Sequence, residues 1–381
     1  MINDSSLVEQ KEMGIGNPNI RTVGLGILKI AGYFIIALVC GETTARIDDY
    51  MRYQIPFFDQ SSLEEALRVN EFGIIKGRPS GRYQRWHLNS FGFRSSEFDI
   101  YDQSKPRIMI LGASESFGTH ESEGKSYSEL LENTLSSRFQ FINASIIGMS
   151  LASMHGYWEE YLAQFKPDTV LILASPLFYL SEQAPVGQKR DSEKQRISSN
   201  KRNLRLDLRV VQRIKNHLSI PAFIQNPLQE SKIQAMIDAH PKDWVFEGPP
   251  EQRLALYREH LSSLIDKISG TGAKVVLLTQ PLSAVYPSRS DDSPHILASR
   301  ILRPRATFEV VWEFCQQCNS ISAELASKKK VEYIDLWASM TGNKVNFSDL
   351  NHFSNAGAKV VADEINTVLS KIYTQDLPLI P

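Results

Sequence analysis

A serine, a histidine and an aspartate are spaced in this sequence so that they could form a nucleophilic catalytic site. Ser114 follows the apolar run Arg107–Leu111 and Gly112, a pattern typical of a strand that ends in a tight turn. A serine hydroxyl needs a base to take its proton. Of the eight histidines, only His352 combines a predicted strand-end loop with a carboxylate three residues earlier, Asp349. That carboxylate would fix the imidazole tautomer, and the other ring nitrogen would take the proton of Ser114.

The elements that must position these residues alternate along the chain. Five apolar runs predict strands at Arg107–Leu111, Phe139–Ala144, Thr169–Ala174, Lys274–Thr279 and Val331–Leu336. Helical patterns cover Ser126–Ser136, Leu151–Phe165, Glu251–Ser269, Phe308–Ser327 and Asn355–Ile372, with a short helix signal at Ser61–Leu67. Ser126 and Glu129 have the spacing of a capping box. We therefore expect an α/β fold, a three-layer α/β/α sandwich around a five-stranded parallel sheet. Such sheets bind ligands at the carboxyl ends of their strands, where Ser114 and His352 lie.

Several segments resemble the sequence blocks of the SGNH (GDSL-like) family of hydrolases and acyltransferases. Gly112–Gly118 is similar to the first block, a Gly-Asp-Ser followed a few residues later by Gly. Asn143–Gly148 is similar to the second block, and Asp349–His352 looks like the last, Asp-x-x-His, in the right chain order. Asn89–Arg94 resembles a segment common in membrane-tethered bacterial members. The resemblance covers roughly residues 85–372.

This resemblance implies a flavodoxin-like SGNH hydrolase fold with a triad of Ser114, His352 and Asp349. In the family, the N–H of the second-block glycine lines the oxyanion hole, which assigns that role to Gly148. The helix that starts at Ser114 would offer a further backbone N–H to the oxyanion. Arg94 could orient an anionic substrate, or it could be a surface arginine.

The sequence departs from the family pattern at two positions. Ala113 stands where the family has an aspartate beside the nucleophile. The third block offers an asparagine as a side-chain oxyanion donor, but Ala174–Tyr179 contains none. Ser175 could substitute for it or could be a small strand-end residue. Ser116 is a rival nucleophile that does not match the family position.

An apolar segment near the N-terminus predicts a membrane anchor. Val23–Cys40 has eighteen residues with one charge, and a helix of that length spans roughly 27 Å, close to a bilayer core. A cleaved signal peptide and a buried core helix are the alternatives. We expect a polar tail at residues 1–22, a transmembrane helix at 23–41, an approach segment at 42–105 and the catalytic domain at 106–375. An insert at 181–250 interrupts this domain, and its basic stretch at 189–215 is either a solvated helical excursion or a lid or anion-binding surface.

The composition argues against several classes of function. The chain has 381 residues and a net charge of −1, which disfavours nucleic acid as a partner. Three cysteines are too few for a disulfide scaffold. Two of them, Cys315 and Cys318, fall inside a predicted helix and lack the partner pair that a metal site would need. We expect neither a cofactor nor a metal, and the sequence leaves the oligomeric state open.

Together these features predict a membrane-anchored serine esterase or O-acyltransferase. Its substrate would be an ester, such as an O-acetyl group on a cell-envelope glycan, and its catalytic domain would face the periplasm or the cell exterior. The alternatives are a weakly active or inactive module that binds an envelope polysaccharide, and a lipid esterase at the membrane surface.

Overall fold

A five-stranded parallel sheet forms the centre of the fold. The computed structural model describes residues 18–59, 63–71, 73–181, 208–217, 222–288 and 293–374. The strands are β5 (Arg107–Gly112), β6 (Gln140–Asn143), β7 (Thr169–Leu173), β8 (Lys274–Leu278) and β9 (Glu332–Ile334). They lie in the order β6-β5-β7-β8-β9, with every neighbouring pair parallel. The expected five-stranded parallel sheet is therefore confirmed.

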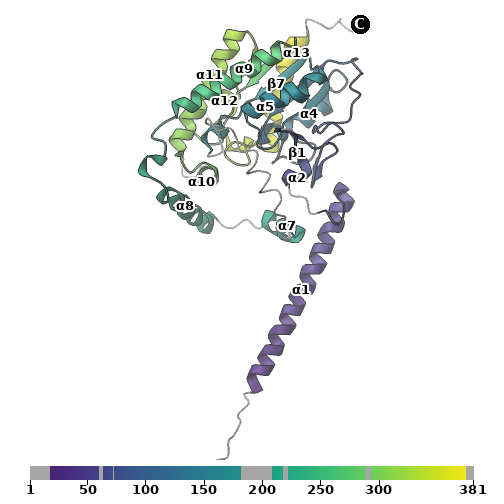
Figure 1. The fold of residues 1–381 in the computed structure, drawn as a ribbon, viewed down its shortest axis with the longest axis vertical. Coiled ribbons are helices and arrows are strands. Elements are labelled where there is room, and N and C mark those ends of the chain that lie inside the picture. Colours follow the sequence, from purple (N-terminus) through teal and green to yellow (C-terminus); the bar gives the residue numbers. More distant parts are fainter. Residues whose placement is uncertain are drawn as a thin grey trace, which may run out of the picture. The chain divides into compact units, whose positions relative to one another are not determined.

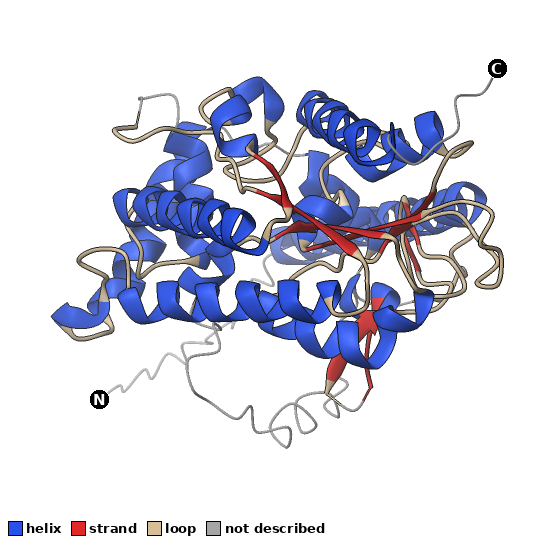
Figure 2. Ribbon diagram, turned by 90° about the horizontal axis from the view of Figure 1, so that it is seen from above, coloured by secondary structure: helices blue, strands red, loops and turns tan. Residues whose placement is uncertain are grey.

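Helices cover both faces of this sheet, which makes three layers (Figures 1 and 2). Alternate residues of β5 belong to different cores: Met109 and Leu111 to one, Ile108 and Ile110 to the other. The first core includes residues of α5 (Leu151–Tyr157), α9 (Glu251–Ser269) and α11 (Phe308–Lys329). The second includes residues of α4 (Tyr127–Leu135) and α13 (Asn355–Thr374). Burial on both faces explains why these strands are almost continuously apolar.

Local signals set several of the helix boundaries. Ser126 caps α4, and Glu129 completes the capping box that the sequence predicts. The helical pattern at Leu151–Phe165 is less regular than expected: α5 is followed by the π-helix η1 (Trp158–Leu162) and the 3-10 turn η2 (Ala163–Phe165). Cys315 and Cys318 are buried in α11 as free thiols.

The long N-terminal helix α1 (Pro18–Tyr53) groups with α7 (Arg209–His217) in a compact unit of its own. Gly26–Tyr53 contains an apolar stretch of mean hydropathy 1.6, none of it buried, so α1 meets the length and composition requirements of one membrane span. A signal sequence near an N-terminus meets them too. Beyond Cys40 the helix carries two i,i+4 ion pairs, Glu42–Arg46 and Asp48–Arg52, which favour the helical conformation.

The basic stretch at 189–215 is only partly visible. Residues 189–207 lie outside the described residues, and the remainder contributes to α7. There, Arg213 donates to Asp48 and Asp49 of α1, at 2.7 and 2.5 Å, so its charge is balanced within this unit.

The second unit contains the sheet and begins at Asp59. Its first part has the short helix α2 (Leu63–Leu67), which was expected, and two hairpins that were not. The hairpins are β1 (Arg68–Glu71) with β2 (Ile74–Gly77), and β3 (Arg82–Tyr83) with β4 (Trp86–His87). The remaining helices are α3 (Ser114–Phe117), η3 (Pro176–Leu180), α8 (Ala222–Asp238), η4 (Lys242–Trp244), α10 (Ser293–Leu302), α12 (Leu336–Met340) and η6 (Lys344–Asn346).

Candidate active site

The turn after β5 presents Ser114 at the carboxyl end of the sheet. Gly112 is required there, because a Cβ at this position would lie 2.3 Å from Ser116 Oγ. Ser114 is partly exposed and opens the one-turn helix α3, whereas Ser116 is fully buried. Gly118 ends α3 with a φ of 82°, a left-handed conformation that favours glycine. The turn therefore exposes Ser114 and buries its rival Ser116.

Arg94 fixes the far end of this turn. Its guanidinium is buried and donates through Nη1 to the carbonyls of Phe117 and Gly118, the latter at 2.6 Å. Its Nη2 donates to Glu129 at 3.2 Å. The proposed role of Arg94 in binding an anionic substrate stays a prediction, but these contacts use its donors within the protein and favour a positioning role.

The Asp-x-x-His loop after η6 organises its own carboxylate. Asp349 Oδ1 accepts the backbone N–H groups of Asn351 and His352, at 3.0 and 2.8 Å, as in an Asx turn. The His352 carbonyl accepts the N–H of Ser348 at 2.9 Å and closes the loop. These two backbone hydrogen bonds to Oδ1 fix the side-chain rotation of Asp349 and leave Oδ2 free to contact the imidazole of His352.

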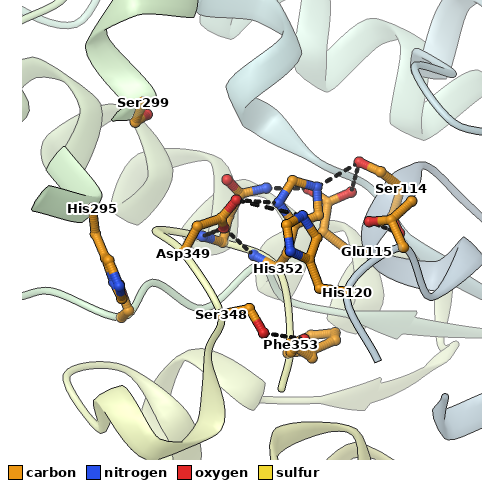
Figure 3. A network of polar contacts seen from close by, with 12 residues as sticks. Ser114, Glu115, His120, His295, Ser299, Ser348, Asp349, His352 and Phe353 are labelled. Carbon is orange, nitrogen blue, oxygen red and sulfur yellow. Dashed lines mark hydrogen bonds and ion pairs between the residues drawn. The ribbon is translucent and has the colours of Figure 1, made fainter. Parts of the chain in front are cut away.

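One hydrogen-bonded chain joins Ser114, His352 and Asp349, although Ser114 and His352 are 238 residues apart in the sequence (Figure 3). His352 Nδ1 lies 2.7 Å from Asp349 Oδ2, and His352 Nε2 lies 2.8 Å from Ser114 Oγ. With Nδ1–H donating to the carboxylate, Nε2 is left to accept the serine proton. Both distances are within the range needed for proton transfer. This arrangement can activate a serine oxygen as a nucleophile.

The electrostatics of the site favour a charged Asp349 and a basic His352. Burial would raise the pKa of Asp349, but the hydrogen bond and charge of His352 and the two loop N–H groups outweigh burial and lower it. Burial would lower the pKa of His352, but its hydrogen bond to Asp349 and the charges of Glu115, Asp349 and Glu121 raise it. Burial also raises the pKa of Glu121 to about 7.

A second histidine, His120, lies against the first. Its ring stacks on that of His352 with centroids 4.6 Å apart, and its Nε2 lies 3.8 Å from Asp349 Oδ2. Burial and the charge of His352 lower the pKa of His120. Among the described residues, His120, Asp349 and His352 form a group that could hold a metal ion, with ligand atoms within 4.8 Å of one another. A metal there would compete with the proton that joins Asp349 to His352.

The carboxylate of Glu115, to which sequence reasoning gave no role, connects three segments of the site. It accepts hydrogen bonds from Asn351 Nδ2 at 2.6 Å, Ser175 Oγ at 3.0 Å and Ser114 Oγ at 3.3 Å. Ser175 therefore donates its proton to Glu115 and does not offer it to an oxyanion in this state. No sequence signal reveals these contacts, because Asn351 lies 236 residues from Glu115.

Gly148, the expected oxyanion donor, lies in the loop after β6. It is exposed and has a φ of 77°. The carbonyl of Ile147 accepts a hydrogen bond from Arg68 Nη1 at 2.9 Å. In a trans peptide the C=O and the next N–H point in opposite directions, so Arg68 also sets the direction of the Gly148 N–H. The preceding Asn143 holds the nucleophile turn by donating to Ser116 O at 3.0 Å.

Comparison with known proteins identifies the family to which the chain belongs. The family model described as "SGNH domain (fused to AT3 domains)" matches residues 154–367, more than half of the chain. The match includes Asp349 and His352 and begins after Ser114. No curated protein matches the chain.

Several solved structures are similar at low identity. They include a lipase/acylhydrolase from Enterococcus faecalis, with 17% identity, 70% of this chain and 96% of that chain covered, and a TM-score of 0.40. A GDSL-like lipase from Bacteroides thetaiotaomicron has 11% identity, 72% and 93% coverage and a TM-score of 0.41. An acetylxylan esterase from Geobacillus stearothermophilus has 14% identity, 69% and 93% coverage and a TM-score of 0.39.

Proposed function

We propose, from the premise that the chain belongs to the family of the SGNH domain (fused to AT3 domains), that Ser114, His352 and Asp349 act as its catalytic triad. The chain is an SGNH-type hydrolase or acyltransferase that acts on esters. The observation that carries the triad is the continuous hydrogen-bonded path from Ser114 Oγ through the His352 ring to Asp349.

In the proposed reaction, Ser114 Oγ attacks the acyl carbonyl carbon while its proton passes to His352 Nε2. Collapse of the tetrahedral intermediate breaks the ester bond, and the departing alkoxide takes that proton from His352. Water or a sugar hydroxyl then attacks the acyl-enzyme and gives its proton to His352, and Ser114 Oγ takes that proton back from His352 as it leaves. The backbone N–H groups of Ser114 and Gly148 would stabilise the oxyanion at both stages.

The proposed substrate is an O-acetyl group on a cell-envelope glycan. The support comes from α1, which can anchor the chain to a membrane, and from the resemblance of Asn89–Arg94 to membrane-tethered bacterial members. In this proposal the sheet-containing unit faces the periplasm or the cell exterior, where such glycans are found.

The non-catalytic alternative rests on the oxyanion hole. The third-block asparagine is absent, and the Ser175 hydroxyl donates to Glu115. Loss of one oxyanion donor costs about 10²–10³ in rate in a well-studied serine hydrolase. A weakly active site that binds an envelope polysaccharide is therefore the competing proposal.

A fluorophosphonate probe tests the nucleophile directly. The full chain in detergent micelles should be labelled, and Ser114→Ala should abolish labelling. Ser116→Ala is the matched control, because Ser116 lies two residues away and is buried, so labelling should persist. A folded wild-type chain that is not labelled would exclude the triad and favour the binding module.

The substrate class needs a separate measurement. Purified chain is incubated with acetylated polysaccharide and, in parallel, with phospholipid or triacylglycerol vesicles. Release or transfer of acetate, absent in Ser114→Ala, supports the glycan proposal. Release of fatty acid without any acetate turnover would contradict it and favour the membrane-surface lipid esterase.

A further inference from the structure

A buried carboxylate, that of Glu115, contacts the Ser114 end of the Ser114–His352 pair, whereas the partly buried Asp349 contacts the His352 end. Glu115 is only 2% exposed and extends into the site from α3 (Figure 3). Its Oε1 accepts two hydrogen bonds, from Asn351 Nδ2 and Ser175 Oγ. Its Oε2 lies 3.3 Å from Ser114 Oγ. All three neighbours offer donors, and an ionised carboxylate is an acceptor only, so the charged form of Glu115 satisfies every contact.

Two acceptors therefore compete for the one hydroxyl proton of Ser114. When His352 is neutral, Nε2 at 2.8 Å is the nearer acceptor and takes this hydrogen bond. When His352 carries a second proton, Nε2–H must donate to Ser114 Oγ instead. The Ser114 proton then needs another acceptor, and Glu115 Oε2 is the carboxylate oxygen that the structure places within reach.

We propose that Glu115 is a positioning residue that accepts the Ser114 proton whenever His352 is doubly protonated, and thereby sets the pH range in which the site is active. This inference rests on the proposed function, because only a working Ser114–His352 pair makes the range visible as a rate. Asp349 and Glu115 then hold the two ends of one proton chain, at His352 Nδ1 and at Ser114 Oγ.

Other charged or titratable groups also act on His352 and Glu115, so the effect of Glu115 must be distinguished from theirs. The groups with electrostatic influence on His352 or Glu115 are Asp349, Glu121, His120, Arg303, Cys315 and Tyr127. Glu121 is the useful comparison: it is as deeply buried as Glu115, and its charge also acts on His352. Its carboxylate accepts the backbone N–H of His120, not the proton of Ser114.

The decisive variant is Glu115→Gln. Oε1 meets two donors, so the amide oxygen would take that place and the amide NH₂ would face Ser114 Oγ. With His352 doubly protonated, Ser114 would then face two donors and lose Glu115 as the acceptor of its own proton. The doubly protonated state loses both this hydrogen bond and a negative charge within about 6 Å of the ring. We expect the His352 pKa to fall by about one unit.

Two readouts test this on the full chain in detergent micelles. NMR titration of ¹³C-labelled histidine follows His352 directly, with the signal assigned by its loss in His352→Gln. The pH profile of p-nitrophenyl acetate hydrolysis follows the active form. In Glu115→Gln the rising limb of kcat should move to lower pH together with the NMR titration, and KM should change little. Glu121→Gln should shift both by less.

The outcomes separate the inference from the proposed function. A shift in Glu115→Gln no larger than in Glu121→Gln overturns the role of Glu115, even if the wild type is fully active. An inactive wild type whose His352 titration still moves in Glu115→Gln supports the proton chain and refutes the catalytic proposal. If Glu115→Gln does not fold, Glu115→Asp decides: it keeps the charge but shortens the reach, so a downward shift of the titration is expected, and no shift overturns the inference.

Discussion

Replacing Asp349 with asparagine should inactivate the enzyme by enforcing the wrong imidazole tautomer. Asp349 Oδ1 accepts two backbone N–H groups, and Oδ2 accepts His352 Nδ1. In Asp349→Asn the amide oxygen should stay on the two N–H groups, because the opposite orientation loses two hydrogen bonds, or about 2 kcal/mol. The amide NH₂ then faces Nδ1, and the ring proton moves to Nε2. His352 can no longer take the proton of Ser114.

The expected loss follows from this tautomer and from the missing charge that stabilises the imidazolium. We expect kcat to fall about 10⁴-fold, as in the corresponding substitution of a well-studied serine protease. This corresponds to about 5 kcal/mol of transition-state stabilisation. The assay is p-nitrophenyl acetate hydrolysis by the full chain, with fluorophosphonate labelling rates as a second measure. Asp363→Asn is the control: Asp363 pairs with Lys359 on the exposed face of α13, so its loss should not change the rate. A folded Asp349→Asn protein that loses less than about tenfold would refute the triad reasoning.

Two further predictions concern the surroundings of the triad. Glu121→Gln should stabilise the fold at neutral and alkaline pH. In the wild type, the pKa of Glu121 is about 7 in the folded state and about 4.5 in the unfolded chain, so the wild type loses stability as the pH rises from 4.5 through 7. The glutamine cannot ionise and avoids this loss. The gain in free energy of unfolding should reach about 3 kcal/mol at pH 8 and vanish near pH 4, measured by urea denaturation, and an equal gain at both pH values would contradict it. Arg94→Lys should lower kcat and leave KM unchanged for a neutral and an anionic ester. A single ammonium nitrogen cannot reproduce the planar fork in which Nη1 donates to Phe117 and Gly118 while Nη2 donates to Glu129. A rise in KM for the anionic ester alone would instead support the role of Arg94 in binding substrate.

The sheet could be predicted because its signals are local. Each strand is a short apolar run bounded by turn residues, and burial on both faces needs no alternation with polar residues. The capping box of Ser126 and Glu129 spans four residues, and the structure has it as expected. The family model supports the same assignment of fold and enzyme class.

The hairpins before the sheet could not be predicted in the same way. β1 to β4 have two to four residues each, and charged residues such as Arg68 and Arg82 interrupt any apolar pattern. β1 and β2 are paired with each other by backbone hydrogen bonds, which any sequence can make. The change to a π-helix at Trp158–Leu162 has no local signal either, since this segment contains no glycine or proline.

In the candidate site, too, contacts within a local motif could be predicted, whereas contacts between distant segments could not. Asp349 and His352 lie three residues apart, so their contact follows from a local loop, and the order of the motifs along the chain predicted that Ser114 would meet them. The role of this triad stays a prediction that the experiments above address. Glu115, Ser175 and Asn351 come from three distant segments, and only the folded sheet brings them together.

This division has a consequence for how the proposed reaction is controlled. A local motif can specify which atoms exchange a proton, but the pH at which they do so depends on every charge that the fold places nearby. Asp349 orients His352 from within its own loop, whereas Glu115 acts on it across the sheet edge through Ser114. Substitutions at Asp349 should therefore change how fast the reaction runs at every pH. Substitutions at Glu115 should mainly move the pH at which it begins, and comparing the two pH profiles distinguishes orientation of the base from control of its charge.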